Sequence, residues 1–132
     1  MILLLQILGI VLILLALLHV IFPRYFRWKE ELAGLSLINR EIMGVHTFFI
    51  ALTVVLMGLL LVSSAELLTT TLLGRRICAG MALFWGLRLI CQFFWYSSEN
   101  WKGKPFETVM HILFTLLWLT LTVVFALAAR QH

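Results

Sequence analysis

Charged residues are scarce in this chain. They make up 12% of its 132 residues, whereas hydrophobic residues make up 63%. A soluble domain is about a quarter charged and about half apolar, so this composition excludes a water-soluble enzyme or binding domain. Intrinsic disorder requires low hydrophobicity and high charge, and is excluded as well. The composition indicates a membrane protein.

Cysteine and recognisable metal motifs are equally scarce. The two cysteines, Cys78 and Cys91, are thirteen residues apart in one predicted helix. Helical rise separates them by about 20 Å, which is too far for a disulfide. The chain contains no CxxC, HExxH or Glu-x-x-His motif. No acidic residue lies deep in an apolar run, so a Ser-His-Asp type of catalytic triad is not expected either.

Long apolar runs are abundant. A hydrocarbon core about 30 Å thick requires roughly 20 helical residues to cross it. Four runs meet this length, at residues 2–22, 42–62, 77–96 and 109–128. They do not alternate between polar and apolar residues as the strands of a membrane barrel do. The sequence therefore predicts one all-α domain, a four-helix transmembrane bundle, with an interfacial amphipathic segment at residues 23–41.

The basic residues predict the orientation. Six Lys or Arg residues lie in the connections at 23–41 and 97–108, against three on the other side. The positive-inside rule then places these two connections in the cytoplasm and both termini outside. The first run has no basic start and no cleavage site, and is expected to remain as a span. The net charge of +4 lies at the ends of the runs, so membrane lipids are the expected partners and nucleic acid is not.

In span number and length, the chain is similar to the membrane-associated glutathione and eicosanoid enzymes. Their hallmark is a cluster of Arg, Asn and Glu along the second helix. Here that helix begins Asn39-Arg40-Glu41 and continues Gly44-Val45-His46-Thr47, which departs from the pattern, so no residue role is carried over. The chain looks more like a small bacterial membrane protein, and the bacterial inner membrane is its expected location.

Arg88 is the most informative polar residue. It lies eight residues before Tyr96, about 12 Å from the inner boundary of the third run. A charge at this depth is costly and marks a candidate functional site. Gln92, one turn later, lies on the same helical face. The functional interpretation is an anchor for an anion, carboxylate or carbonyl, and the alternative is a structural bond to Gln92, threonines or backbone carbonyls.

Three histidines form a second candidate set. His19, His46 and His111 lie on three different runs, within about 3–8 Å of the inner boundary. They could hold a metal ion or haem b, or each could bond a backbone carbonyl or a headgroup. Glu107 is one turn before His111, and a hydrogen bond between them would orient the imidazole.

The remaining candidates lie at the boundary itself. Trp95 and Tyr96 flank the Arg88 stripe, and they are expected either to contact a ligand or to belong to an interfacial aromatic belt. Glu41 and Glu107 are expected at the mouth of the pocket, as proton-relay or orienting groups.

These residues support three hypotheses. In the first, the protein binds an amphiphilic or anionic small molecule through Arg88, Gln92, His46, His111, Trp95 and Tyr96. In the second, it is a redox membrane protein in which His19, His46 and His111 bind haem or a metal. In the third, it is an accessory subunit in which Arg88 pairs with an acid of a partner helix, and a homo-oligomer is a related arrangement. Whether it is an enzyme is left open by the sequence.

Overall fold

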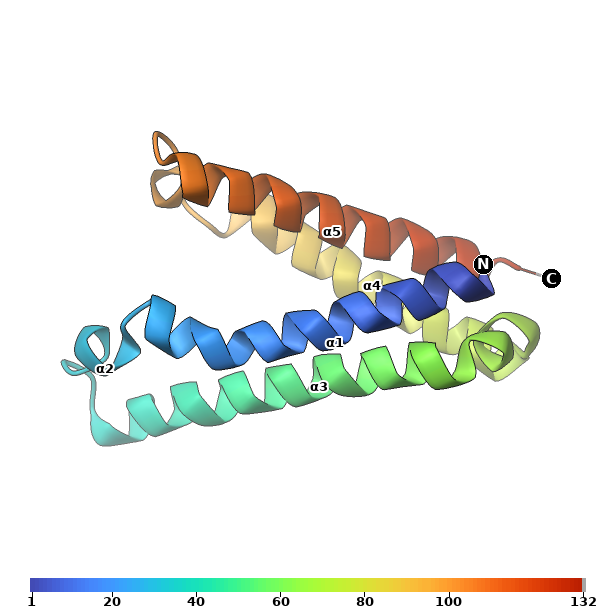
Figure 1. The fold of residues 1–132 in the computed structure, drawn as a ribbon, viewed down its shortest axis with the longest axis horizontal. Coiled ribbons are helices and arrows are strands. Elements are labelled where there is room, and N and C mark those ends of the chain that lie inside the picture. Colours follow the sequence, from blue (N-terminus) through green and yellow to red (C-terminus); the bar gives the residue numbers. More distant parts are fainter. Residues whose placement is uncertain (132) are drawn as a thin grey trace. The chain divides into compact units, whose positions relative to one another are not determined.

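The computed structural model describes residues 1–131, which contain helices and no strands. Four helices are long and apolar enough to cross a membrane: α1 (Ile2–Tyr25), α3 (Leu37–Thr70), α4 (Leu72–Phe94) and α5 (Pro105–Ala129). Figure 1 shows their order along the chain. Helices satisfy every backbone group internally, which apolar surroundings require. The predicted all-α class with four spanning helices is confirmed.

Two short elements join the long helices. The helix α2 (Trp28–Glu31) lies in the connection for which an interfacial amphipathic segment was predicted. It follows Arg27, whose φ of 52° is left-handed and redirects the chain, and whose side chain forms an ion pair with Glu30. The second element, the 3₁₀ turn η1 (Ser98–Asn100), lies between α4 and α5.

The helices are longer than the predicted spans. Helix α1 continues past Pro23 to Tyr25. A proline removes one backbone donor, and because Pro23 lies in the last turn, the helix loses little by including it. Residues 63–76 lie between the second and third predicted spans, and most of them are helical. Their hydroxyl groups bond to carbonyls one turn back, as Thr70 Oγ1 does to Glu66 O at 2.8 Å, so their polarity does not end the helix.

The chain divides into two compact units within α3. One comprises Ile2–Ala65, and the other begins at Glu66 and contains α4 and α5. The division falls beside Ser64, whose backbone (φ −132°, ψ 22°) leaves the helical range inside α3. The neighbouring Ser63 donates from Oγ to Leu59 O at 2.7 Å, a bond of the type that bends helices.

The first unit is a hairpin of α1 and α3 with a glycine contact between the two helices. A Cβ atom added to Gly9 would lie 2.7 Å from the carbonyl oxygen of Gly58, and the reverse distance is also 2.7 Å. The two backbones therefore touch, as small residues permit in membrane helix pairs. Leu5 and Leu12 of α1 and Leu61 of α3 are fully buried.

The second unit is built on the antiparallel pair α4 and α5, which run side by side (Figure 1). Thr71 caps α4 by accepting a hydrogen bond from Gly74 N at 2.9 Å. A Cβ atom on Gly74 would lie 2.3 Å from Leu67 O, so this tight turn requires glycine. At the same end of the unit, Arg75 Nη1 donates to Gln131 O at 3.0 Å and joins the start of α4 to the end of α5.

Candidate functional site

Arg88 lies on α4, six residues before its last residue, Phe94. Six residues correspond to about 9 Å of helical rise. Its guanidinium Cζ lies 4.9 Å from the ring centroid of Trp118 on α5 and 5.5 Å from that of Tyr96. Both contacts are cation–π interactions, which are strengthened where water is excluded. The side chain thus reaches across to α5.

The guanidinium makes one hydrogen bond to the described residues, from Nη1 to Gln92 Oε1 at 3.3 Å. Gln92 is 6% exposed, and its Nε2 atom lies 3.1 Å from His111 Nδ1. Since His111 is six residues into α5 and α5 is antiparallel to α4, the two helices hold Arg88 and His111 at similar depth. Arg88, Gln92 and His111 form one hydrogen-bonded chain between two helices.

The direction of hydrogen-bond donation from Arg88 through Gln92 indicates the tautomer of His111. A guanidinium can only donate, so the amide oxygen of Gln92 faces Arg88 and its NH₂ group faces the imidazole. His111 Nδ1 must then accept, and the ring proton resides on Nε2. The site therefore presents donor groups: the other N–H groups of Arg88 and the Nε2–H of His111.

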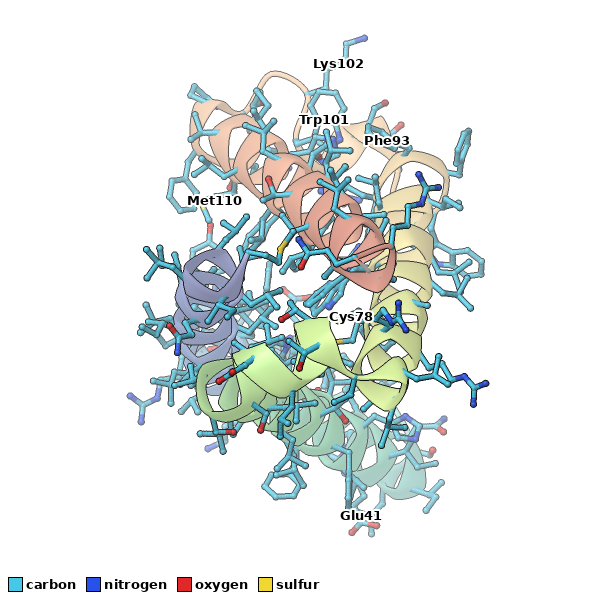
Figure 2. All side chains as sticks on the ribbon, turned by 90° about the vertical axis from the view of Figure 1, so that its right-hand side faces the viewer. Glu41, Cys78, Phe93, Trp101, Lys102 and Met110 are labelled. Carbon is cyan, nitrogen blue, oxygen red and sulfur yellow. The ribbon has the colours of Figure 1, made fainter. Side chains whose placement is uncertain are left out.

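Aromatic rings surround the hydrogen-bonded series of Arg88, Gln92 and His111. Trp85 and Trp118 stack with centroids 5.1 Å apart and planes 11° apart, and Phe114 stacks on Trp118 at 5.6 Å. The ring of Trp101 stacks on His111 at 4.6 Å. Its position is held by Thr108, which donates from Oγ1 to Trp101 O at 2.6 Å. Figure 2 shows Trp101 in the connection before α5, with Lys102 extending outward from it.

We name this set of side chains the Arg88 cluster. It lies entirely within the second unit, and its members are Trp85, Arg88, Gln92, Tyr96, Trp101, His111, Phe114 and Trp118.

The cluster carries an uncompensated charge. Among the residues that the structure describes, the one ion pair is Arg27 with Glu30, and no acidic side chain contacts Arg88. Two indole nitrogens, Trp85 Nε1 and Trp118 Nε1, are buried without a hydrogen-bond partner. A buried donor without an acceptor is costly and calls for an explanation, such as a bound group.

Four predicted site residues meet in the cluster: Arg88, Gln92, His111 and Tyr96. Trp95 is 83% exposed and makes no ring contact with the cluster in the described part of the chain. Glu107 is half-buried, and the described contacts of the His111 ring are with Gln92 and Trp101, not with Glu107. The hydrogen bond expected between Glu107 and His111 is not found among the described residues, and the imidazole Nδ1 faces the amide of Gln92 instead.

The other predicted residues belong to the first unit. His46 and Glu41 are exposed on α3, and the side chain of Glu41 extends away from the helix (Figure 2). His19 on α1 contacts Leu15 O through Nδ1 at 3.0 Å. A bond to a backbone carbonyl is the alternative to metal or haem binding that the sequence left open. Within residues 1–131, no three His, Cys, Asp or Glu side chains gather into a metal-binding group. Haem or metal binding by these histidines stays a prediction.

Trp85 and Trp118 were missed as site residues. Trp85 is three residues before Arg88, and Trp118 is seven residues, or two helical turns, after His111. These spacings place each tryptophan on the polar face of its own helix. This signal was available, but tryptophan in an apolar run is usually interpreted as packing or as an interfacial anchor.

The fold and the cluster define an all-α protein with four helices of membrane-spanning length and one charged, aromatic-lined cluster inside the second pair. Comparison with protein-family models, curated proteins and solved structures finds no match. The functional argument therefore rests on the cluster.

Proposed function

We propose that this chain is a small integral membrane protein that binds an amphiphilic molecule through Arg88. The ligand has an anionic or carbonyl head, which the guanidinium holds, and an apolar tail. The observation that carries this proposal is a half-buried guanidinium about 9 Å inside α4 with one protein hydrogen bond and no acidic partner among the described residues. Four further N–H donors remain available to a ligand.

Membrane energetics support a ligand over a purely structural role. A charged side chain inside a spanning helix is costly, and insertion scales put the cost at roughly 2.5–3.5 kcal/mol. The contacts with Gln92, Tyr96 and Trp118 offset part of this cost, but none of them carries a negative charge. A residue with this cost and incomplete compensation is typical of a binding site.

The proposed setting is the bacterial inner membrane. The connections at 23–41 and 97–108 face the cytoplasm and both termini face outward, as the excess of Lys and Arg in those connections favours. Arg88 lies nearer the 97–108 end of its helix, so the ligand head enters from the cytoplasmic half of the membrane.

The missing acidic partner also supports a second candidate, an accessory subunit. In that case a carboxylate on a helix of another membrane protein pairs with Arg88 and neutralises it. The two candidates differ in what accompanies the purified chain, which is a small molecule in the first and a second polypeptide in the second.

The test is native mass spectrometry of the full chain, released from gentle detergent and from nanodiscs. The wild type, Arg88→Ala and Arg88→Lys are compared, with Arg130→Ala as the control because Arg130 is an exposed arginine at a helix end. We expect an amphiphile bound to the wild type and to Arg130→Ala, weaker binding by Arg88→Lys, and loss of at least about 100-fold in affinity in Arg88→Ala. Such a loss corresponds to about 3 kcal/mol, the strength of a charge-assisted contact.

A bound amphiphile that is equally retained by Arg88→Ala contradicts the proposal. A wild-type chain that carries no amphiphile but co-purifies with a second polypeptide, lost in Arg88→Ala, assigns the protein to the accessory-subunit class instead.

A further inference from the structure

The hydrogen-bonding inventory of the Arg88 cluster identifies the chemistry of the ligand head. Several donors of the cluster have no protein partner: guanidinium N–H groups of Arg88 and the buried indole N–H groups of Trp85 and Trp118. The one strong acceptor of the cluster, Gln92 Oε1, already bonds Arg88. A head that only donates, such as an ammonium group, would leave these donors without acceptors. The head must therefore be an acceptor.

One of the two indoles lies against the guanidinium, and the other stacks on the first. Arg88 Cζ is 4.9 Å from the ring of Trp118, and Trp85 stacks on Trp118 at 5.1 Å. The side chains of Trp85 and Trp118 are 2% and 5% exposed, so lipid headgroups and bulk water do not solvate their N–H groups. An oxygen of a ligand bound to Arg88 would supply an acceptor beside the Trp118 ring, on which Trp85 stacks.

The charge of the cluster limits the net charge of the ligand head. The cluster contains one positive charge and no negative charge. A single negative charge on the head neutralises it, whereas a neutral carbonyl leaves the guanidinium uncompensated and a dianion reverses the imbalance. Arginine also matches the two oxygens of a carboxylate with two parallel hydrogen bonds. Charge and geometry together favour a monoanionic, planar head.

Depth separates a carboxylate from a phosphodiester. Arg88 lies about 9 Å inside its helix, whereas the phosphate of a phospholipid lies in the headgroup layer outside the hydrocarbon core. A phosphodiester at Arg88 would also bring its second substituent to that depth. A fatty carboxylate carries nothing beyond its two oxygens, and its single chain remains in the apolar region.

We infer that the ligand is a long-chain carboxylate whose two oxygens accept hydrogen bonds from Arg88 and from the indole N–H groups of Trp85 and Trp118. This inference rests on the proposed function and specifies its ligand class. Trp85 and Trp118 are assigned as ligand-binding residues, in addition to their stacking role.

The test uses the full chain in phosphatidylcholine nanodiscs with palmitate labelled at its carboxyl carbon. Hexadecanol, hexadecylphosphocholine and a long-chain quinone serve as competitors. We expect palmitate to bind, its carboxyl resonance to shift, and the indole N–H resonances of Trp85 and Trp118 to move downfield as they gain an acceptor. Binding should weaken at acidic pH, because protonation removes the negative charge of the carboxylate. None of the three competitors should displace palmitate at equal concentration.

The variants Trp85→Phe and Trp118→Phe remove one donor each and keep an aromatic ring for stacking. We expect each to weaken palmitate binding about tenfold, the effect of losing one hydrogen bond to a charged group. Trp28→Phe is the matched control, because Trp28 lies on α2 in the other unit. Thermal melting of each variant confirms that it is folded, and the N–H resonances of the wild type provide a readout that requires no variant.

The outcomes separate this inference from the proposed function. Binding of hexadecanol, the quinone or hexadecylphosphocholine that depends on Arg88, with Trp85→Phe and Trp118→Phe unchanged, overturns the carboxylate assignment and retains the proposed function. Absence of Arg88-dependent binding for all four probes overturns both.

Discussion

The two units of this chain hold their helices together in different ways. In the unit of α1 and α3, Gly9 and Gly58 allow the two backbones to touch, and the buried neighbours are leucines. In the unit of α4 and α5, indole and phenyl rings stack between the helices, and a chain of polar groups crosses from Arg88 to His111. Both units have a strongly apolar sequence, so hydropathy alone does not distinguish them.

The difference bears on the role proposed for the Arg88 cluster. Lipid tails are as apolar as leucine, so membrane helices associate through close packing and hydrogen bonds instead of the hydrophobic effect. In the first unit, two helices pair around a glycine contact and buried apolar side chains. An arginine is thus no general requirement for pairing helices in this chain, which fits the binding role proposed for Arg88.

The largest effect should come from removing the central ring of the second unit. In Trp118→Ala, stacking with Trp85 and Phe114 and the cation–π contact of Arg88 are lost together. We expect the free energy of unfolding to fall by about 3 kcal/mol, the lower end for buried Trp→Ala because transfer from water contributes little in lipid. Denaturation of the chain in mixed micelles measures this change. Trp95→Ala is the control, since Trp95 is 83% exposed, and an equal loss in both variants contradicts the stacking account.

The next largest loss of stability is expected from a substitution that breaks the backbone contact of the first unit. In Gly9→Ala, the new methyl group lies 2.7 Å from Gly58 O, and α1 and α3 must separate. Overpacking of this kind costs about 1–3 kcal/mol, which the same denaturation experiment detects. Gly44→Ala is the matched control on α3, where a Cβ atom meets nothing within 4 Å. That variant should be neutral or slightly stabilising, because alanine favours the helix. A neutral Gly9→Ala would show that the glycine contact does not pair the helices.

The smallest change in the free energy of unfolding is expected when one glutamine of each unit is replaced. Gln92→Leu removes the bridge between Arg88 and His111, and we expect a loss of about 1 kcal/mol, typical of hydrogen bonds between membrane helices. Gln6→Leu removes a single bond of 3.5 Å from Gln6 Nε2 to Val62 O, and its effect should be a few tenths of a kcal/mol. Side-by-side denaturation curves test this order, and a larger effect in Gln6→Leu would reverse the comparison.

Several features of the fold were accessible from the sequence. The four long apolar helices follow from hydropathy, because apolar surroundings leave the backbone few structures that satisfy its polar groups. The helix ends were less accessible. The polar residues 63–76 resemble a loop by composition, yet Ser and Thr hydroxyls bond the preceding turn and extend α3 to Thr70.

The candidate site was accessible in part. Helical rise along each single chain segment places Gln92 and His111 near one depth, and periodicity puts Arg88 on the same face as Gln92. The structure joins the three. Which partners they choose depends on how α4 and α5 rotate against each other, and this is a property of packing. Periodicity along one helix could not show that the ring of Trp118 covers Arg88 or that Gln92, not Glu107, bonds His111.

The sequence by itself thus determined the class of the protein, its four helices and the depth of its one intramembrane arginine, because hydropathy and helical rise are local properties of the chain. The tertiary structure decided that Trp85 and Trp118 stack beside that arginine, that their N–H groups are buried without acceptors, and that α1 and α3 meet at two glycines. These contacts join residues about 30 to 50 positions apart. They depend on the rotation and register of packed helices, which hydropathy does not encode.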